Sequence, residues 1–243
     1  MYVIDWTTGI AIWAHITCVV DGSSVLGRPP AKAASFYPGK IVSTDTMNSM
    51  LTNDNINSHI ISCLLPDNTA DETCDQNIQN SWVSNLSYKP NIYLNPNVRL
   101  GNPKSQADTA ISTITAKTKI GYVWIDVIDA TYWPGPVSAN QHFLSSFLDY
   151  LENYPWPSPS ASFGIRTNEL GWLNLMGNWT TPADNGTVLW NVLLDGDYNS
   201  GSVSFGGWRT ADCKQYLEKN TLESTLVDLS NFSSEPESIR FKK

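Results

Sequence analysis

Two carboxylates, Asp126 and Asp129, interrupt an apolar run near its end, in the sequence G-Y-V-W-I-D-V-I-D-A-T-Y-W at Gly121–Trp133. Carboxylates are common general acids and bases, and in α/β barrels the catalytic groups sit at the C-terminal ends of the strands. These two residues are therefore the first candidates for chemistry in this chain. An equally simple interpretation is that they cap the following helix or face water.

The residues before Asp126 form the element that must position it. Tyr122, Val123, Trp124 and Ile125 are strand formers, and a continuous apolar run of this length suits a strand covered on both faces, as in a parallel sheet. Apolar spacing predicts helices that alternate with strands along the chain. Strands are expected near 2–5, 24–28, 91–95, 122–127, 162–167, 187–194, 214–217 and 226–229, with a strand or a helix at 56–65, and helices near 9–20, 76–86, 105–118, 140–151 and 170–175. This order predicts an α/β fold with a parallel sheet or barrel.

The domain organisation follows from where this alternation holds. Residues 1–232 are predicted to form one domain, which suits a chain of 243 residues. The stretch 31–75 is rich in Asn, Ser, Thr and Asp, and we interpret it as an excursion inserted into the domain. Residues 233–243 are a polar C-terminal tail.

Composition excludes several classes of partner. The formal net charge is -8, and the 15 Lys and Arg residues form no basic cluster, so binding to nucleic acid or to an anionic membrane surface is not expected. No apolar run approaches the roughly 20 residues that span a bilayer. The three histidines are scattered and no C-x-x-C pair occurs, so neither a metal site nor a cofactor is expected.

Cysteines and glycosylation sequons favour an oxidising compartment. Of the three possible pairings of the four cysteines, we favour Cys63–Cys74, which leaves Cys18–Cys213; four free buried thiols are the alternative. The Asn-X-Ser/Thr sequons begin at Asn85, Asn178, Asn185 and Asn231. Together they predict a protein that is secreted, extracellular, or in the lumen of a secretory or lysosomal compartment.

The order of short motifs resembles glycoside hydrolase family 25, the Chalaropsis-type lysozymes, and in particular the animal and protist members. The motifs are Y-V-I-D at Tyr2–Asp5, V-W-I-D-V at Val123–Val127, Tyr132-Trp133, F-G-I-R-T-N at Phe163–Asn168, G-W-L-N-L-M-G at Gly171–Gly177, Leu189-Trp190, F-G-G-W at Phe205–Trp208, K-Q-Y at Lys214–Tyr216 and V-D-L-S-N at Val227–Asn231. Each match is weak alone, but the series in one order is specific.

This resemblance implies a flattened, irregular β/α barrel that resembles a TIM barrel. It also implies cleavage of the β-1,4 bond after N-acetylmuramic acid in peptidoglycan, which needs one carboxylic acid as proton donor and a second carboxylate. Asp5, Asp126 and Asp228 are the candidate catalytic carboxylates. The candidate glycan-binding residues are Tyr132, Trp133, Arg166, which replaces the family's usual tyrosine, Trp190 and Trp208.

One departure from the family decides the functional prediction. The family's strand reads D-x-E, with the glutamate as the acid, but the third position here is Ile128. We therefore predict a catalytically impaired, lysozyme-like protein that binds a glycan or has a structural role outside the cell. One alternative is an active muramidase that uses Asp129, which a β-bulge could re-aim, or another carboxylate. Another is a subunit of an extracellular assembly that associates through 31–75 and the tail.

Overall fold

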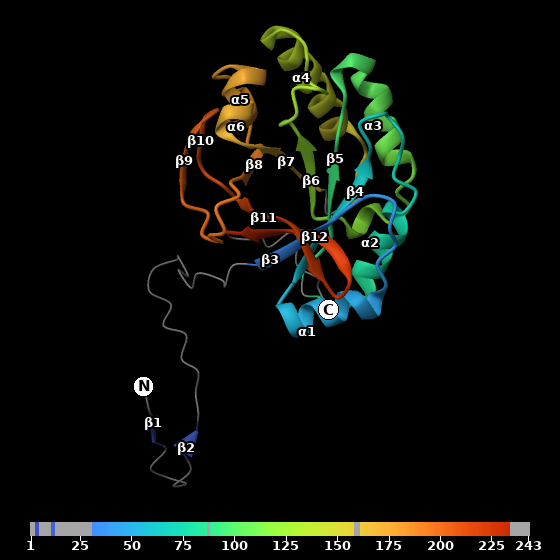
Figure 1. Ribbon diagram of the computed structural model, residues 1–243, viewed down its shortest axis with the longest axis vertical. Helices are drawn as coiled ribbons and strands as arrows, with labels where there is room; N and C mark the ends of the chain where they lie inside the picture. The colour runs from blue at the N-terminus through green and yellow to red at the C-terminus, as the bar shows by residue number, and fades with distance from the viewer. Residues whose placement is uncertain (1–2, 5–10, 13–30, 87, 158–160, 234–243) are drawn as a thin grey trace.

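The computed structural model describes residues 3–4, 11–12, 31–86, 88–157 and 161–233. Its centre is a closed barrel of eight strands in the order β11-β12-β3-β4-β5-β6-β7-β8 (Figure 1). The strands are β3 (Ala31–Phe36), β4 (Ser58–Leu64), β5 (Asn91–Leu94), β6 (Tyr122–Asp126), β7 (Ser162–Thr167), β8 (Val188–Val192), β11 (Cys213–Leu222) and β12 (Thr225–Phe232). The predicted α/β barrel is confirmed.

Strand direction places several chain segments at one rim of the barrel. Neighbouring strands from β3 to β8 are parallel, and β8 is also parallel to β11. β12 pairs antiparallel with both β11 and β3. The C-terminal ends of the parallel strands and the N-terminal end of β12 therefore meet at the same rim, which is where barrel enzymes carry their sites.

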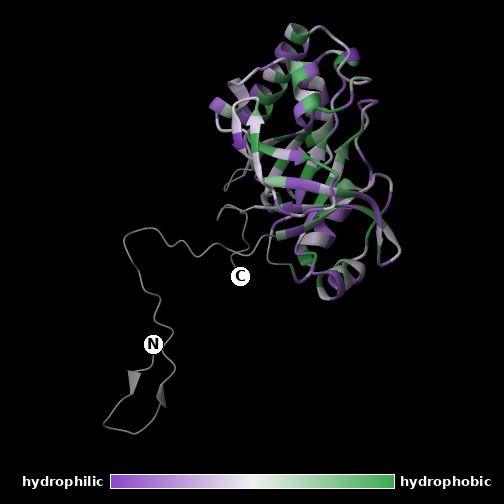
Figure 2. Ribbon diagram, turned by 60° about the vertical axis from the view of Figure 1, so that its left-hand side comes forward, coloured by the Kyte–Doolittle hydropathy of each residue, from purple (hydrophilic) through white to green (hydrophobic). Residues whose placement is uncertain are grey.

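Helices pack against the outside of the barrel (Figure 1). They are α1 (Thr44–Asp54), α2 (Cys74–Val83), α3 (Pro103–Ser112), α4 (Val137–Asn153), α5 (Glu169–Met176) and α6 (Thr181–Asp184), with short 3-10 turns at Val98–Leu100 and Lys117–Lys119. The apolar stripe of α4 is buried as its 3.6-residue spacing predicts, through Phe143, Leu144, Phe147, Leu148 and Leu151. Figure 2 shows hydrophobic residues along the central strands. None of the helices in the described residues is long and apolar enough to cross a membrane.

Two predictions about the first part of the chain are corrected. The stretch 31–75 is not an excursion, because it contributes β3 and β4 to the barrel, with α1 between them. The motif at Tyr2–Asp5 was expected to open the barrel, but β1 (Val3–Ile4) pairs instead with β2 (Ala11–Ile12) in a separate two-stranded sheet. β3 therefore opens the eight-stranded barrel. A second small hairpin, β9 (Ser202–Phe205) with β10 (Trp208–Thr210), also lies outside it.

The favoured disulfide is present. Cys63, on β4, and Cys74, at the start of α2, are fully buried and joined, with their Cα atoms 5.0 Å apart. The bond fastens α2 to the barrel wall. Cys213 is buried on β11, and its predicted partner, Cys18, lies outside the described residues.

Removing this bond is expected to destabilise the fold measurably. A disulfide that closes a loop of this length contributes about 2–3 kcal/mol by restricting the unfolded chain. We expect a Cys63→Ala/Cys74→Ala variant to lose that free energy of unfolding in urea titrations, or about 4–12 °C in Tm. Reductant should destabilise the wild-type protein by a similar amount and leave the variant unchanged. Equal stability of variant and wild type would contradict a structural role for this bond.

Candidate functional site

A pocket of about 230 Å³ opens at the rim formed by the strand ends. It brings together side chains from most of the barrel strands, including two of the three candidate catalytic carboxylates. Its lining residues are Ser35, Phe36, Tyr37, Tyr93, Asp126, Arg166, Trp190, Glu218 and Asp228. The third candidate, Asp5, lies outside the described residues.

Asp126 is held by an ion pair at the end of β6. Arg166 is its direct neighbour on the parallel strand β7, and the Arg166 Nη1 atom lies 2.6 Å from Asp126 Oδ1. Both side chains are largely buried, with 16% of Arg166 and 8% of Asp126 exposed. Burial raises the pKa of Asp126, and the positive charge of Arg166 opposes that rise. The carboxylate therefore faces a fixed guanidinium as well as the pocket.

A hydrogen-bonded chain links Asp126 to Asp228 across the barrel. Arg166 Nε and Nη2 donate to Gln215 Oε1 at 3.1 and 2.9 Å, and Gln215 Nε2 donates to Asp228 Oδ2 at 3.1 Å. Tyr37 donates its hydroxyl to Asp228 Oδ1 at 2.8 Å, and burial together with Asp228 raises the pKa of Tyr37, which keeps it protonated. Both carboxylates thus have fixed partners in the protein.

The aromatic candidates are distributed between the pocket wall and the core. Trp190 lines the pocket with only 1% of its surface exposed, and Arg166 Cζ lies 5.2 Å from its ring centroid. Trp133 is equally buried and donates its indole N–H to the Asp126 carbonyl at 3.0 Å, so it supports the end of β6. Trp208 is buried and donates to the Thr187 carbonyl at 2.7 Å. Among these three, only Trp190 contributes to the pocket.

Asp129 and Tyr132 lie on the turn after β6, outside the residues that line the pocket. Asp129 is exposed and its Oδ1 accepts a hydrogen bond from the Thr131 backbone N–H at 2.8 Å. Its carbonyl accepts from the amides of Tyr132 and Trp133. Tyr132 is half-buried. This arrangement fits the interpretation that the Asp129 carboxylate stabilises a turn.

Sequence reasoning missed several lining residues, of which Glu218 is the most informative. It is an exposed carboxylate on β11, and it faces the same pocket as Asp126 and Asp228. The register of β11 against β12 shifts between Gln215 and Leu217 and again before Asn220, so simple strand alternation does not predict where Glu218 points. Ser35 and Tyr37 were missed because their stretch was interpreted as an excursion.

A glycine opposite Trp124 fixes the wall behind Trp190. Trp124 on β6 pairs directly with Gly164 on β7, and a Cβ atom on Gly164 would lie 2.2 Å from Trp124 Cζ3. The Trp124 ring in turn contacts Trp190, with centroids 5.6 Å apart. Trp124 and Trp190 can therefore pack closely only because residue 164 is a glycine.

We expect a Gly164→Ala variant to lose about 1–3 kcal/mol of unfolding free energy, because an added methyl group overpacks a fully buried ring. Urea denaturation measures this loss. A Ser162→Ala variant on the same strand serves as the control, since Ser162 is half-buried and the change removes an atom rather than adding one. If both variants had wild-type stability, the contact between Gly164 and Trp124 would not constrain this wall.

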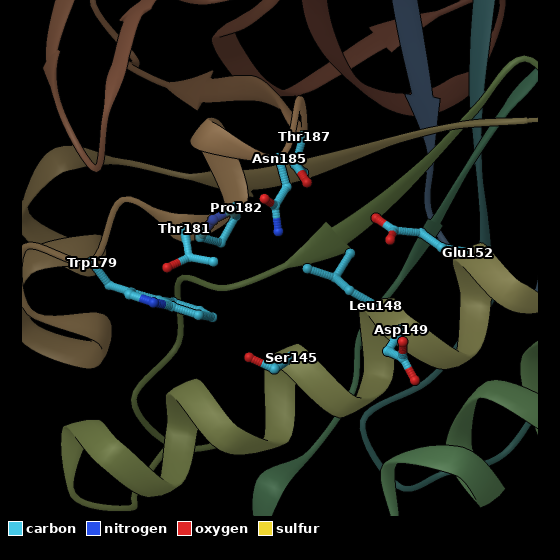
Figure 3. Close-up of a pocket in the computed structure, with 9 residues that line it drawn as sticks. All are labelled: Ser145, Leu148, Asp149, Glu152, Trp179, Thr181, Pro182, Asn185 and Thr187. Atoms are coloured by element: carbon cyan, nitrogen blue, oxygen red, sulfur yellow. The ribbon is translucent and has the colours of Figure 1, made fainter.

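A second pocket, of about 140 Å³, lies between α4 and α6 (Figure 3). Asp149 and Glu152 from α4 approach it from one side and Trp179, Asn185 and Thr187 from the other. Burial raises the pKa of Glu152, and the charge of Asp149 adds to the rise. Thr187 immediately precedes β8, so this pocket is near the strand starts, at the opposite end of the barrel from Asp126.

The predicted glycosylation sites differ in accessibility. Asn85, Asn178 and Asn185 are exposed. Asn231 is only 6% exposed, and its side-chain amide donates to the Tyr198 carbonyl at 3.1 Å. A glycan on Asn231 would break this contact, so the folded protein does not present that residue as an acceptor. Among the described residues, no group of three or more His, Cys, Asp or Glu side chains could hold a metal ion.

Comparison with known proteins adds sequence and fold relationships. The family model described as Lys-1, lysozyme-like protein 1, matches residues 38–216. The chain is 32% identical over 126 residues to a probable GH family 25 lysozyme 4 of Dictyostelium discoideum, which covers 51% of this chain and 55% of that protein. It is 26% identical over 114 residues to lysozyme-like protein 1 of Caenorhabditis elegans, covering 44% and 36%. The chain spans about half, or less, of the length of these curated relatives.

Solved structures show the same fold at low identity. A muramidase from Acremonium alcalophilum superposes with a TM-score of 0.65 at 15% identity, covering 87% of this chain and 96% of that one. A family GH25 lysozyme from Aspergillus fumigatus gives a TM-score of 0.63 at 13% identity, covering 86% and 95%. The resemblance to glycoside hydrolase family 25 is confirmed by these matches together.

Proposed function

The chain belongs to the lysozyme-like protein 1 family, and from that premise we propose that it binds a glycan in the rim pocket without hydrolysing it. In this proposal the protein has a lysozyme-like fold but lacks the proton donor that hydrolysis needs. It keeps the pocket and the carboxylate at the end of β6. Its ligand is expected to be a cell-wall glycan or a chemically related one.

The observation that carries this proposal is the residue two positions after Asp126. Ile128 is half-buried and cannot donate a proton, whereas glycoside hydrolysis needs a carboxylic acid to protonate the leaving oxygen. Asp126 itself is engaged by Arg166 at 2.6 Å. Burial raises the pKa of this carboxyl and the guanidinium opposes the rise, so Asp126 is held in a fixed contact with the protein.

What remains in the pocket suits binding. Polar groups from six different strands converge on a concavity that is open to solvent, and one wall is the tryptophan Trp190. Pockets that combine an apolar wall with a few fixed polar groups are typical ligand sites. Because the hydrogen-bonded chain between Asp126 and Asp228 fixes these groups, little ordering is needed when a ligand binds.

Two measurements on the wild-type protein test the proposal. We expect it to cosediment with insoluble peptidoglycan and to leave the turbidity of a bacterial wall suspension unchanged. Glu218→Trp, at the edge of the pocket, should weaken cosedimentation, while Glu72→Trp, at an exposed position outside the pocket, should not. Clearing at the rate of an active muramidase, or equal binding by both variants, would refute the proposal.

An active muramidase is the second candidate, and it has one supporting observation. Glu218 and Asp228 line the same pocket as Asp126, so other carboxylates are available for acid catalysis. If the wild-type protein clears walls, Glu218→Gln and Asp228→Asn test the two carboxylates of the pocket, and Asp129→Asn tests the donor that the sequence suggests. Loss of activity in only one of these variants identifies its proton source.

Secretion is part of the proposal. The buried Cys63–Cys74 disulfide and the exposed sequons at Asn85, Asn178 and Asn185 support an oxidising, extracellular setting. Analysis of the native protein by mass spectrometry tests it directly. Glycans on the exposed asparagines would support secretion, whereas reduced cysteines and bare asparagines would count against it.

A further inference from the structure

The pocket between α4 and α6 carries the acceptor asparagine of a glycosylation sequon on its wall. Asn185, at the end of α6, begins the sequon Asn185-Gly-Thr, and it is exposed where it lines the pocket. Figure 3 shows its side-chain nitrogen directed toward α4, into the space between the two helices. Within the described part of the chain this amide makes no hydrogen bond, in contrast to the amide of Asn231. A glycan on Asn185 would therefore begin inside the pocket.

The pocket has room for a sugar and continues past Asn185. A neighbouring concavity of about 310 Å³ shares Glu152, Asn185 and Thr187 with it and is otherwise lined by residues near the starts of β6, β7 and β8. One water molecule needs roughly 10–15 Å³ of such volume, so the first pocket, of about 140 Å³, holds the equivalent of about ten waters. We call the two concavities together the base groove.

The walls of the base groove match the two kinds of surface that a sugar presents. The ring of Trp179 stacks on Trp172, with centroids 6.2 Å apart and planes inclined by 6°, and Figure 3 shows it extending into the pocket. The negative face of an aromatic ring attracts C–H groups such as those of a sugar ring. Across the pocket, Glu152 makes no hydrogen bond or ion pair with any described residue, so its carboxylate can accept hydrogen bonds from sugar hydroxyls.

The Trp179 side of the groove is fixed before any sugar arrives. The Trp172 indole N–H donates to the Trp179 carbonyl at 3.0 Å. The backbone N–H of Thr187 donates to the Pro182 carbonyl at 2.9 Å, and the Thr187 carbonyl accepts from the Trp208 indole at 2.7 Å. A sugar that enters this groove therefore meets ordered walls, and little further ordering opposes its packing.

We propose that the chain carries an N-linked glycan at Asn185 and that the first N-acetylglucosamine of this glycan packs in the base groove as part of the folded structure. The inference rests on the proposed secretion, because the secretory pathway supplies the donor, a lipid diphosphate-linked oligosaccharide. In the transfer, a bond forms between Asn185 Nδ2 and the sugar C1, the bond from C1 to the diphosphate oxygen breaks, and the amide loses one proton. Covalent attachment makes the later packing intramolecular, so weak contacts are enough to hold the sugar.

Removal of this sequon is expected to lower the thermal stability of the glycosylated protein. The full chain is secreted from a eukaryotic host that makes high-mannose glycans, and mass spectrometry measures the occupancy of each sequon. We expect Asn185→Gln to lower Tm by about 2–4 °C, the effect of losing one packed ring in a protein of this size. The matched control is Asn85→Gln, whose exposed sequon lies outside the base groove and whose loss should leave Tm unchanged. Endoglycosidase H, which leaves only the first sugar on the asparagine, should also leave Tm unchanged.

Two further measurements locate the contact. If the sugar packs on Trp179, Asn185→Gln should lower Tm in the wild-type background but not in Trp179→Ala, where the ring is already gone. The second measurement needs no variant at all. Peptide N-glycosidase, which must reach the first sugar, should release the glycan of Asn85 from the native protein at least about tenfold faster than that of Asn185, and should release both at similar rates after denaturation.

The outcomes separate this inference from the proposal on which it rests. Glycans on Asn85 and Asn178 with a bare Asn185 would overturn the inference and leave secretion in place. Equal Tm values for Asn185→Gln and Asn85→Gln, or equal release of both glycans from the native protein, would do the same. Bare asparagines at all three positions in protein from its natural source would overturn the proposed secretion itself.

Discussion

An Ile128→Glu variant is expected to clear bacterial cell walls about 10²–10⁴-fold faster than the wild-type protein. The range is that of a single general acid in the transition state, and the upper end is appropriate for a sugar leaving group that departs poorly without protonation. The change restores the third residue of the D-x-E pattern that the family resemblance implies for this strand.

Local space permits this change, and the new carboxylate must turn toward the pocket to act. Ile128 lies beyond the end of β6 and outside the residues that line the pocket, so strand alternation does not fix the direction of its side chain. Ile128 is only half-buried. The Ile128 side chain faces Gly171 on α5: a Cβ atom added to that glycine would lie 3.6 Å from Ile128 Cγ1. Because Gly171 has no side chain, there is space on the α5 side for a longer residue at position 128.

The matched control is Ile128→Gln, because glutamine has the same length as glutamate and is also polar but has no acidic proton to transfer. We expect Ile128→Glu to be active and Ile128→Gln to be inactive in the same turbidity assay, with similar urea denaturation midpoints. If Ile128→Glu folds and binds peptidoglycan but clears no wall, the missing acid is not the sole defect. The Asp126–Arg166 ion pair is then the next element to change.

The sequence predicts the fold best where apolar periodicity is strong. The run at Tyr122–Asp126 became β6, and the amphipathic spacing in 140–151 became the centre of α4. The prediction from sequence failed at β3, whose sequence A-K-A-A-S-F contains no β-branched residue. That strand forms because β12 and β4 pair with it on either side, and such long-range pairing leaves no local signal.

The site was only partly predictable for the same reason. The proximity of Asp126 and Arg166 follows from their positions at the ends of neighbouring parallel strands. In contrast, the bond from Tyr37 to Asp228 joins residues 191 positions apart, and the irregular register of β11 sets the direction of Glu218. Closure of the barrel creates these contacts, and no motif encodes them.

An Arg166→Met variant is expected to lose about 3–5 kcal/mol of unfolding free energy at neutral pH, the usual effect of removing one partner from a buried ion pair. Methionine replaces the aliphatic stem of the arginine side chain but leaves the Asp126 carboxylate, 8% exposed, without its partner at 2.6 Å. It also removes both donors to Gln215. Arg166→Lys is the matched control, because it keeps a positive charge but lacks the planar fork, so its loss should be smaller.

The pH dependence of this loss identifies its cause. Burial already raises the pKa of Asp126, and Arg166 opposes the rise, so the variant should raise that pKa further. A carboxyl whose folded-state pKa exceeds its unfolded value of about 3.9 binds more protons in the folded state, so its stability falls as pH rises between the two values. The deficit of Arg166→Met should therefore be small near pH 4 and largest near pH 7 in urea titrations. Adding Asp126→Leu to Arg166→Met should abolish this dependence on pH, since no buried carboxyl would remain at this site to be ionised. If Arg166→Met loses the same stability at pH 4 and at pH 7, the loss comes from the Gln215 contacts instead.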